Sequence, residues 1–115
     1  MKELKKIKIG KYEIEKPIIQ GGMGVGLSWD QLAGTVSANG GLGTVSAICT
    51  GYYKNMKFIK KEVNGRPFGT ENTYSKEALN EIFKNARKIC GDKPLACNIL
   101  HAINDYERVV GDALE

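Results

Sequence analysis

The sequence predicts an α/β fold in which short parallel strands alternate with helices. Apolar runs at 18–20, 42–47 and 94–100 are each followed by a segment with helical spacing of apolar residues. The runs are continuous and lack the polar alternation of a half-exposed strand, which is typical of a parallel sheet covered by helices. The 115 residues suffice for one domain, but not for two ordinary cores.

Residues 1–16 are expected to form a short β-hairpin ahead of this pattern. Apolar and polar residues alternate on both sides of a reversal at Gly10 and Lys11. The apolar members are Ile7, Ile9, Tyr12 and Ile14.

The first strand–helix unit contains a glycine-rich loop at 21–26. Ser28 and Gln31 form an S-x-x-Q capping box that predicts a helix start, and Gly40 predicts its end. Glycine lets a backbone approach a ligand closely, so the loop is a candidate binding element. A βα turn that merely requires glycine remains the alternative. The dinucleotide fingerprint fails, because Leu27 stands where its last glycine is required.

The second unit begins with the strand at 42–47 and continues through a long connection at 49–74. That connection holds several glycine and asparagine residues and only a weak helical pattern, so an excursion loop is expected. Ser75 is positioned to cap a helix with one apolar stripe, and Gly91 to end it.

The third unit comprises the strand at 94–100 and a helix that a capping box of Asn104 and Glu107 should start. The helical pattern reaches Glu115 without a stop signal. We therefore expect these residues to be a truncated part of a larger fold, because a parallel sheet with an exposed edge is a poor place for a domain to end.

Composition excludes several function classes. Lys+Arg (17) minus Asp+Glu (13) gives +4, spread diffusely, which disfavours nucleic-acid binding. No window approaches about 20 apolar residues and no apolar signal region follows the basic start, so neither membrane spanning nor secretion is expected. Cys49, Cys90 and Cys97 form no C-x-x-C pair, which disfavours disulfides and metal sites and favours the cytoplasm.

Three motifs in order resemble one protein family, the nitronate monooxygenases, formerly called 2-nitropropane dioxygenases. The family's P-I-x-Q-G-x-M segment matches residues 17–23 and its G-G-L-G turn matches 40–43. Its G-V-N-[IL] strand matches 96–99, where this chain departs by carrying Ala96 and Cys97. The related flavin-dependent enoyl-acyl-carrier-protein reductases share these motifs.

The resemblance implies an FMN-binding TIM (β/α)₈ barrel, with residues 17–115 as the first three βα units of a single partial domain, 1–115. The backbone of Gly22, Met23 and Gly24 would border the flavin, and the Asn98 side chain would hydrogen-bond it. Two alternatives stay open, in which these residues have structural roles only. Asn98 would be an ordinary cap at the end of its strand, and Met23 would fill a gap in the core.

The implied activity is oxidation of alkyl nitronates, small-molecule substrates, with dioxygen. The catalytic histidine is expected beyond residue 115, because His101 does not match its position. Cys90 and Cys97 are expected to pack in the interior, and of the three cysteines we expect Cys49 to be exposed near a ligand. We expect the 115 residues alone to be inactive, since a full barrel needs about 200 or more.

Two other hypotheses about the function remain. A flavin-dependent enoyl-acyl-carrier-protein reductase would differ in its substrate and in using a nicotinamide donor. A non-catalytic half-barrel would associate with a partner or with itself through its exposed sheet edge.

Overall fold

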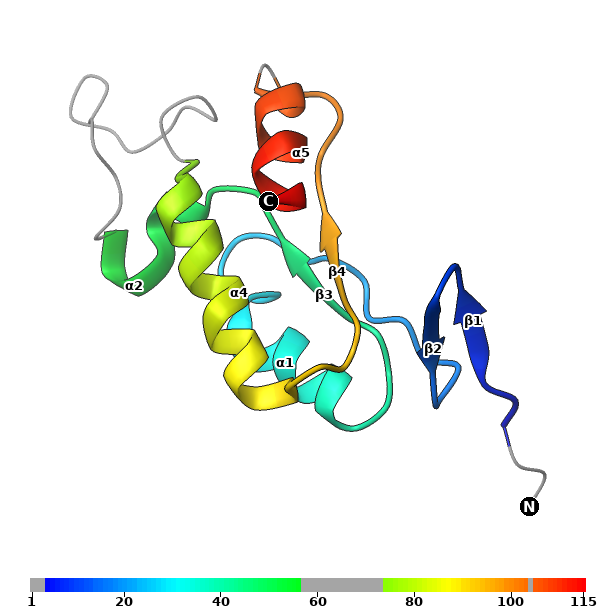
Figure 1. Cartoon of the computed structure of the whole chain (residues 1–115). Coiled ribbons are helices and arrows are strands. Elements are labelled where there is room, and N and C mark those ends of the chain that lie inside the picture. Colours follow the sequence, from blue (N-terminus) through cyan, green and yellow to red (C-terminus); the bar gives the residue numbers. More distant parts are fainter. Residues whose placement is uncertain (1–3, 57–73, 104) are drawn as a thin grey trace, which may run out of the picture.

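The computed structural model describes residues 4–56, 74–103 and 105–115, and its element order is α/β as predicted. The expected hairpin is confirmed: β1 (Ile7–Ile9) pairs antiparallel with β2 (Tyr12–Ile14). Its turn contains Gly10 at φ +56°, a conformation that glycine adopts without strain. Figure 1 shows the hairpin set apart from the other strands and the helices.

The remaining strands form a short parallel sheet. β3 (Gly43–Ser46) pairs in parallel with β4 (Leu95–Asn98). The predicted first strand is shorter than expected, since residues 18–20 form only an isolated parallel bridge of Ile19 with Leu42. β3 therefore lies between β4 and the segment 18–20, as the central strand of a parallel α/β unit.

The helix α4 (Lys76–Cys90) begins and ends as the sequence predicts. Ser75 caps α4, because its Oγ accepts a hydrogen bond from Ala78 N at 3.2 Å. Gly91 ends the same helix at φ +60°. α5 (Tyr106–Leu114) follows β4; Asn104 of its predicted capping box lies outside the described residues. In the long connection, the described part holds a 3₁₀ turn, η1 (Thr50–Tyr52), and one helical turn, α2 (Tyr53–Met56).

The predicted capping box at Ser28 is wrong. The N-cap of the first helix, α1 (Asp30–Ala38), is Trp29, one residue later than predicted, and it makes no side-chain cap. The Ser28 hydroxyl instead donates a hydrogen bond to Thr44 O on β3. A buried serine satisfies the nearest available acceptor, and here β3 supplies that acceptor in place of the helix end.

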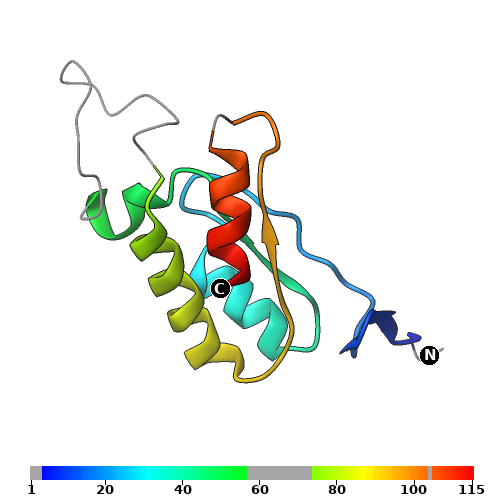
Figure 2. The ribbon, with the colours of Figure 1, turned by 45° about the horizontal axis from the view of Figure 1, so that its top comes forward.

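The helices share one core on one face of the sheet. Figures 1 and 2 show α1, α4 and α5 grouped together beside β3 and β4. The buried cluster draws from β3 and from each of the three helices, and Leu95 and Cys97 of β4 are partly buried against it; its members are Trp29, Ala33, Val45, Ala47, Tyr53, Ala78, Leu79, Ile82 and Val109. At the start of α4, the Tyr74 hydroxyl donates to Asp112 Oδ2 of α5 at 2.8 Å. Burial, with this carboxylate, raises the pKa of Tyr74, so the phenol stays protonated.

Small residues let α1 approach both β3 and α4 closely. A Cβ added at Gly34 of α1 would lie 3.0 Å from Ala86 O of α4. A Cβ added at Gly43 would overlap the carbonyl of Ala33. Neither glycine has a positive φ, so the close approach of backbones is what requires them.

We expect Gly43→Ala to lower the free energy of unfolding by about 2–3 kcal/mol, because α1 or β3 must move to admit the methyl group. Gly111→Ala in α5 is the matched control. Nothing lies within 4 Å of its added Cβ, so it should raise stability by about 0.5–1 kcal/mol through helix propensity. Urea unfolding of both variants measures this, and a Gly43→Ala protein as stable as the parent would contradict the packing described.

Candidate functional site

The glycine-rich loop, which in the structure extends by one residue to 21–27, lies across the carboxyl ends of β3 and β4. A Cβ added at Gly22 would lie 2.7 Å from both Cγ and Nδ2 of Asn98, which ends β4. A Cβ added at Gly24 would overlap the Cγ2 methyl of Ile48, just beyond β3. The structure thus brings together the loop and the strand ends that the sequence predicts as one site.

Contact, and not backbone conformation, explains the glycines at these two positions. Neither Gly22 nor Gly24 has a positive φ, whereas Gly26 does, at +80°. A side chain at position 22 or 24 would collide with Asn98 or Ile48. The loop can therefore bring its bare backbone against the strand ends only with glycine there.

Asn98 presents its amide on the sheet face that points away from the helices. In the parallel register, Ser46 pairs with Asn98 and Thr44 with Ala96, so these four side chains share one face. The Asn98 carbonyl accepts from Ala47 N at 3.0 Å, which extends the pairing of the two strands. The Asn98 side chain is exposed and makes no hydrogen bond with the described part of the chain, so it caps nothing there.

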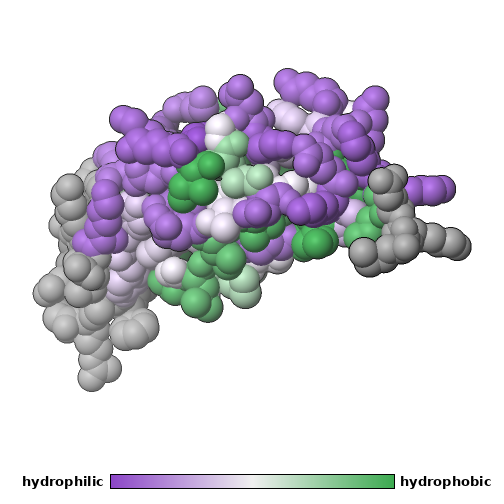
Figure 3. All heavy atoms as spheres, turned by 90° about the horizontal axis from the view of Figure 1, so that it is seen from below, coloured by the Kyte–Doolittle hydropathy of each residue, from purple (hydrophilic) through white to green (hydrophobic). Residues whose placement is uncertain are grey.

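The loop offers a ligand both apolar side chains and backbone donors. Met23 is 42% exposed in this structure, and Val25 and Leu27 are exposed too. In the view from below, hydrophobic residues gather on the lower side of the molecule and hydrophilic ones cover the upper side (Figure 3). The N–H groups of residues 22–24 donate no hydrogen bond within the described residues.

Sequence reasoning missed two residues that hold this loop, Gln20 and Ser28. Gln20 Nε2 donates to Ser28 Oγ at 2.5 Å, which joins the residue before the loop to the residue after it. Gln20 Oε1 accepts from Thr44 N at 3.0 Å. Ser28 is fully buried, and its hydroxyl donates to Thr44 O. The family motif at 17–23 includes Gln20, and Ser28 was interpreted as a helix cap, but the sequence does not show their role in holding the loop, because the partner of both residues lies on another strand.

The cysteines and the histidine contribute no evident nucleophile or base. Cys90 is buried, as predicted. Cys97 packs against the helix-side core, and burial raises the pKa of its thiol to about 11, so the thiol is protonated at neutral pH. Cys49 is half-buried beyond β3. His101 is exposed, and its ring packs edge-on against Tyr106 with the ring centroids 4.6 Å apart.

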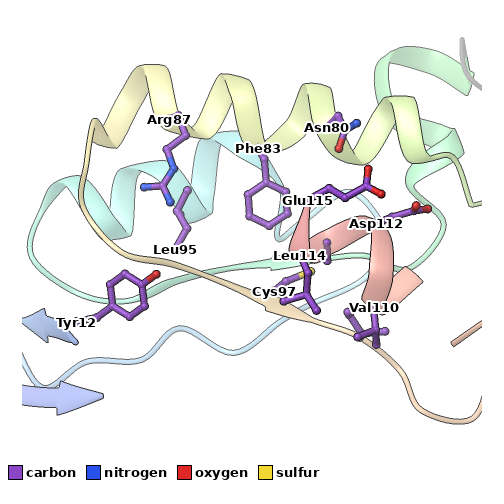
Figure 4. Close-up of a pocket in the computed structure, with 12 residues that line it drawn as sticks. Tyr12, Asn80, Phe83, Arg87, Leu95, Cys97, Val110, Asp112, Leu114 and Glu115 are labelled. Atoms are coloured by element: carbon purple, nitrogen blue, oxygen red, sulfur yellow. The ribbon is translucent and has the colours of Figure 1, made fainter. Parts of the chain in front are cut away.

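A groove of about 900 Å³ lies on the opposite, helix-covered side of β4. Figure 4 shows Phe83 of α4 and Val110 and Leu114 of α5 around it, with Cys97 at its floor. Neither the glycine-rich loop nor Asn98 lines this groove. It is therefore separate from the candidate site.

Within residues 4–56, 74–103 and 105–115, no group of three or more His, Cys, Asp or Glu side chains is placed to hold a metal ion. No helix of this part is long and apolar enough to cross a bilayer.

The fold and the site define a class: parallel α/β proteins that carry a glycine-rich loop at the carboxyl ends of their strands, where this class places its ligands. The family model for nitronate monooxygenase matches residues 5–115. The chain therefore belongs to the nitronate monooxygenase family, whose members are oxidoreductases and are generally flavin-dependent. A search of curated proteins finds no match.

We expect Gly22→Ala to displace the Asn98 side chain, because the added methyl group occupies the space of that residue. The Asn98 Nδ2 resonances should shift in a ¹⁵N–¹H spectrum, and stability should fall by about 1–3 kcal/mol. Gly21→Ala is the control, since nothing lies within 4 Å of its added Cβ. Equal spectra for the two variants would mean that the loop does not contact Asn98.

Proposed function

We propose that this chain forms the first three βα units of an FMN-binding (β/α)₈ barrel, and that the complete protein oxidises alkyl nitronates with dioxygen. One observation carries the proposal: the bare backbone of the loop at 21–27 lies against Asn98 at the carboxyl ends of parallel strands. Barrel enzymes place their active sites at this end of the strands. Membership in the nitronate monooxygenase family supports the reaction class.

The residues present fit a flavin. The N–H groups of Gly22, Met23 and Gly24 are free within the described residues to donate to ring or phosphate oxygens. The Asn98 amide can both donate and accept, as the polar edge of a flavin ring requires. The exposed Met23 and Val25 side chains offer apolar surface to a ring system.

In this proposal the chain binds and orients, while the cofactor performs the redox chemistry. FMN, when bound, supplies the electron transfer between nitronate and dioxygen. Residues 22–24 and Asn98 hold it in place. Proton transfer is assigned to a histidine outside these residues, because His101 packs against Tyr106 and matches no family position.

A flavin-dependent enoyl-acyl-carrier-protein reductase is the nearest alternative within the same fold. It would use the same loop and the same asparagine, so the geometry of this site favours neither reaction. The electron donor separates them: a reductase requires a nicotinamide, whereas nitronate oxidation proceeds with dioxygen alone.

The test uses protein expressed from the uninterrupted reading frame that encodes these residues. We expect it to release FMN on denaturation and to consume dioxygen with propyl-1-nitronate in the absence of a nicotinamide. Asn98→Ala should weaken FMN binding about tenfold, the equivalent of one hydrogen bond to the ring. Asn80→Ala, an exposed asparagine on α4, should leave the Kd unchanged.

Three outcomes would count against the proposal. Protein without flavin would reject the cofactor assignment, and turnover only with a nicotinamide and an enoyl thioester would favour the reductase. The 115-residue chain alone should quench FMN fluorescence weakly, so tight stoichiometric quenching would show that these three units already make a complete site.

A non-catalytic half-barrel that self-associates is the second candidate function. Ile18 and Ile19, on the segment beside β3, are 54% and 55% exposed and could bury surface against a second copy. Light scattering of the 115-residue chain should then show a dimer or larger species that Ile19→Lys dissociates. A strictly monomeric, folded chain would exclude this candidate.

A further inference from the structure

The main-chain hydrogen bonds on one edge of β3 stop where the glycine-rich loop begins. Leu42 N donates to Ile18 O at 2.8 Å, and Gln20 N donates to Leu42 O at 2.9 Å. In a regular parallel ladder, Thr44 N would next donate to Gln20 O, and Gly22 N would donate to Thr44 O. Neither main-chain bond forms, because the chain leaves the sheet after Gln20.

The Gln20 side chain makes both missing bonds, and at Thr44 O it shares the acceptor with the Ser28 hydroxyl. Its Oε1 accepts from Thr44 N at 3.0 Å, and its Nε2 donates to Thr44 O at 3.2 Å. A primary amide carries the same carbonyl and N–H as a peptide group, so it can replace one rung of the ladder. Thr44 is 7% exposed, and an unpaired peptide there would be costly.

The ladder resumes on the far side of the loop. Ser46 N donates to Ser28 O at 2.8 Å, and Trp29 Nε1 donates to Ser46 O at 3.2 Å. The bond from Gln20 Nε2 to Ser28 Oγ joins the two ends of the loop directly. Residues 21–27 thus leave and rejoin the same edge of β3.

We propose that Gln20 is a positioning residue whose side-chain amide takes the place of a peptide in the sheet and so releases residues 21–24 to cross the strand ends toward Asn98. If the main chain had to pair with Thr44, Gly22 would lie in the strand with its N–H already used. The role of this position in holding a flavin rests on the function proposed above. The peptide replacement itself does not.

The experiment uses the ¹⁵N-labelled 115-residue chain without flavin and measures amide hydrogen exchange. Gln20→Leu should lower the protection of Thr44 N–H at least about tenfold, the equivalent of one lost hydrogen bond. It should also shift the Asn98 Nδ2 resonances. Protection of Leu79 and Ile82 in the middle of α4 should be unchanged.

Gln20→Glu separates hydrogen bonding from simple packing. The ionised carboxylate could still accept from Thr44 N, but its second oxygen carries no proton and would face the Thr44 carbonyl oxygen, so repulsion between these two oxygens should expel the side chain and leave Thr44 N without its acceptor. The protonated acid can both accept from Thr44 N and donate to Thr44 O, as the amide does. Protection of Thr44, relative to the parent at the same pH, should be low at pH 7. It should return as the pH falls through the pKa of the introduced carboxyl group.

Gln31→Leu and Gln31→Glu are the matched controls, because Gln31 is an exposed glutamine on α1. Neither should change Thr44 protection at any pH. The inference would be overturned if Thr44 N–H stayed fully protected in Gln20→Leu. It would also be overturned if the protection lost in Gln20→Glu did not return at low pH. If Gln20→Leu does not fold, the pH series of Gln20→Glu decides alone. Since no flavin is present, failure of the proposed function would leave this result standing.

Discussion

The interior of this protein depends on one requirement: β3 is buried along its whole length, so its peptide groups must find partners on both edges. β4 supplies them on one edge through a parallel register. On the other edge, the partners come in turn from the main chain at 18–20, the Gln20 amide, and Ser28 with Trp29. The loop at 21–27 leaves the sheet along this edge, so its course follows from how the peptide groups of β3 are hydrogen-bonded.

The same strand limits the residues that can face it. Gly43 sits against the carbonyl of Ala33, and Gly34 lets α1 reach the backbone of α4. Ser37 of α1 adds two hydrogen bonds to this contact, since its hydroxyl donates to Pro94 O at 2.7 Å and accepts from Gly43 N at 2.9 Å. The helix layer is thereby tied to β3 and to the entry of β4, which keeps the carboxyl ends of the two strands side by side.

Several polar side chains of the described residues are buried and hydrogen-bonded within the fold, whereas Asn98 is not. Ser28, Ser37, Thr50 and Ser75 are buried, and each bonds a backbone group of another segment or caps a helix. Their hydrogen bonds are used within the fold. Asn98 differs, because its amide is exposed at a strand end, faces away from the helices and has no partner among the described residues. A polar group left over beside a bare glycine backbone is what a ligand site requires.

Much of the fold could be predicted because its signals are local. The hairpin about Gly10, the apolar run of β3 and the cap and stop of α4 at Ser75 and Gly91 each reflect the preferences of neighbouring residues. The resemblance of three motifs also predicted the family and pointed to Gly22 and Asn98 as parts of one site.

The rest depended on partners distant in the sequence. The sequence predicts Ser28 to be a helix cap, but its hydroxyl donates a hydrogen bond to Thr44 O on β3, 16 residues later. Gln20 belongs to a motif of the family, but its role could not be predicted, because its amide acts as a peptide only where a strand 24 residues later passes beside it. The sequence by itself determined which segments become strands and helices, since propensity and periodicity act over a few residues. Only the tertiary structure decided where the loop leaves the sheet and why Gly22 and Gly24 must be glycine, because those are contacts between backbones that folding brings together.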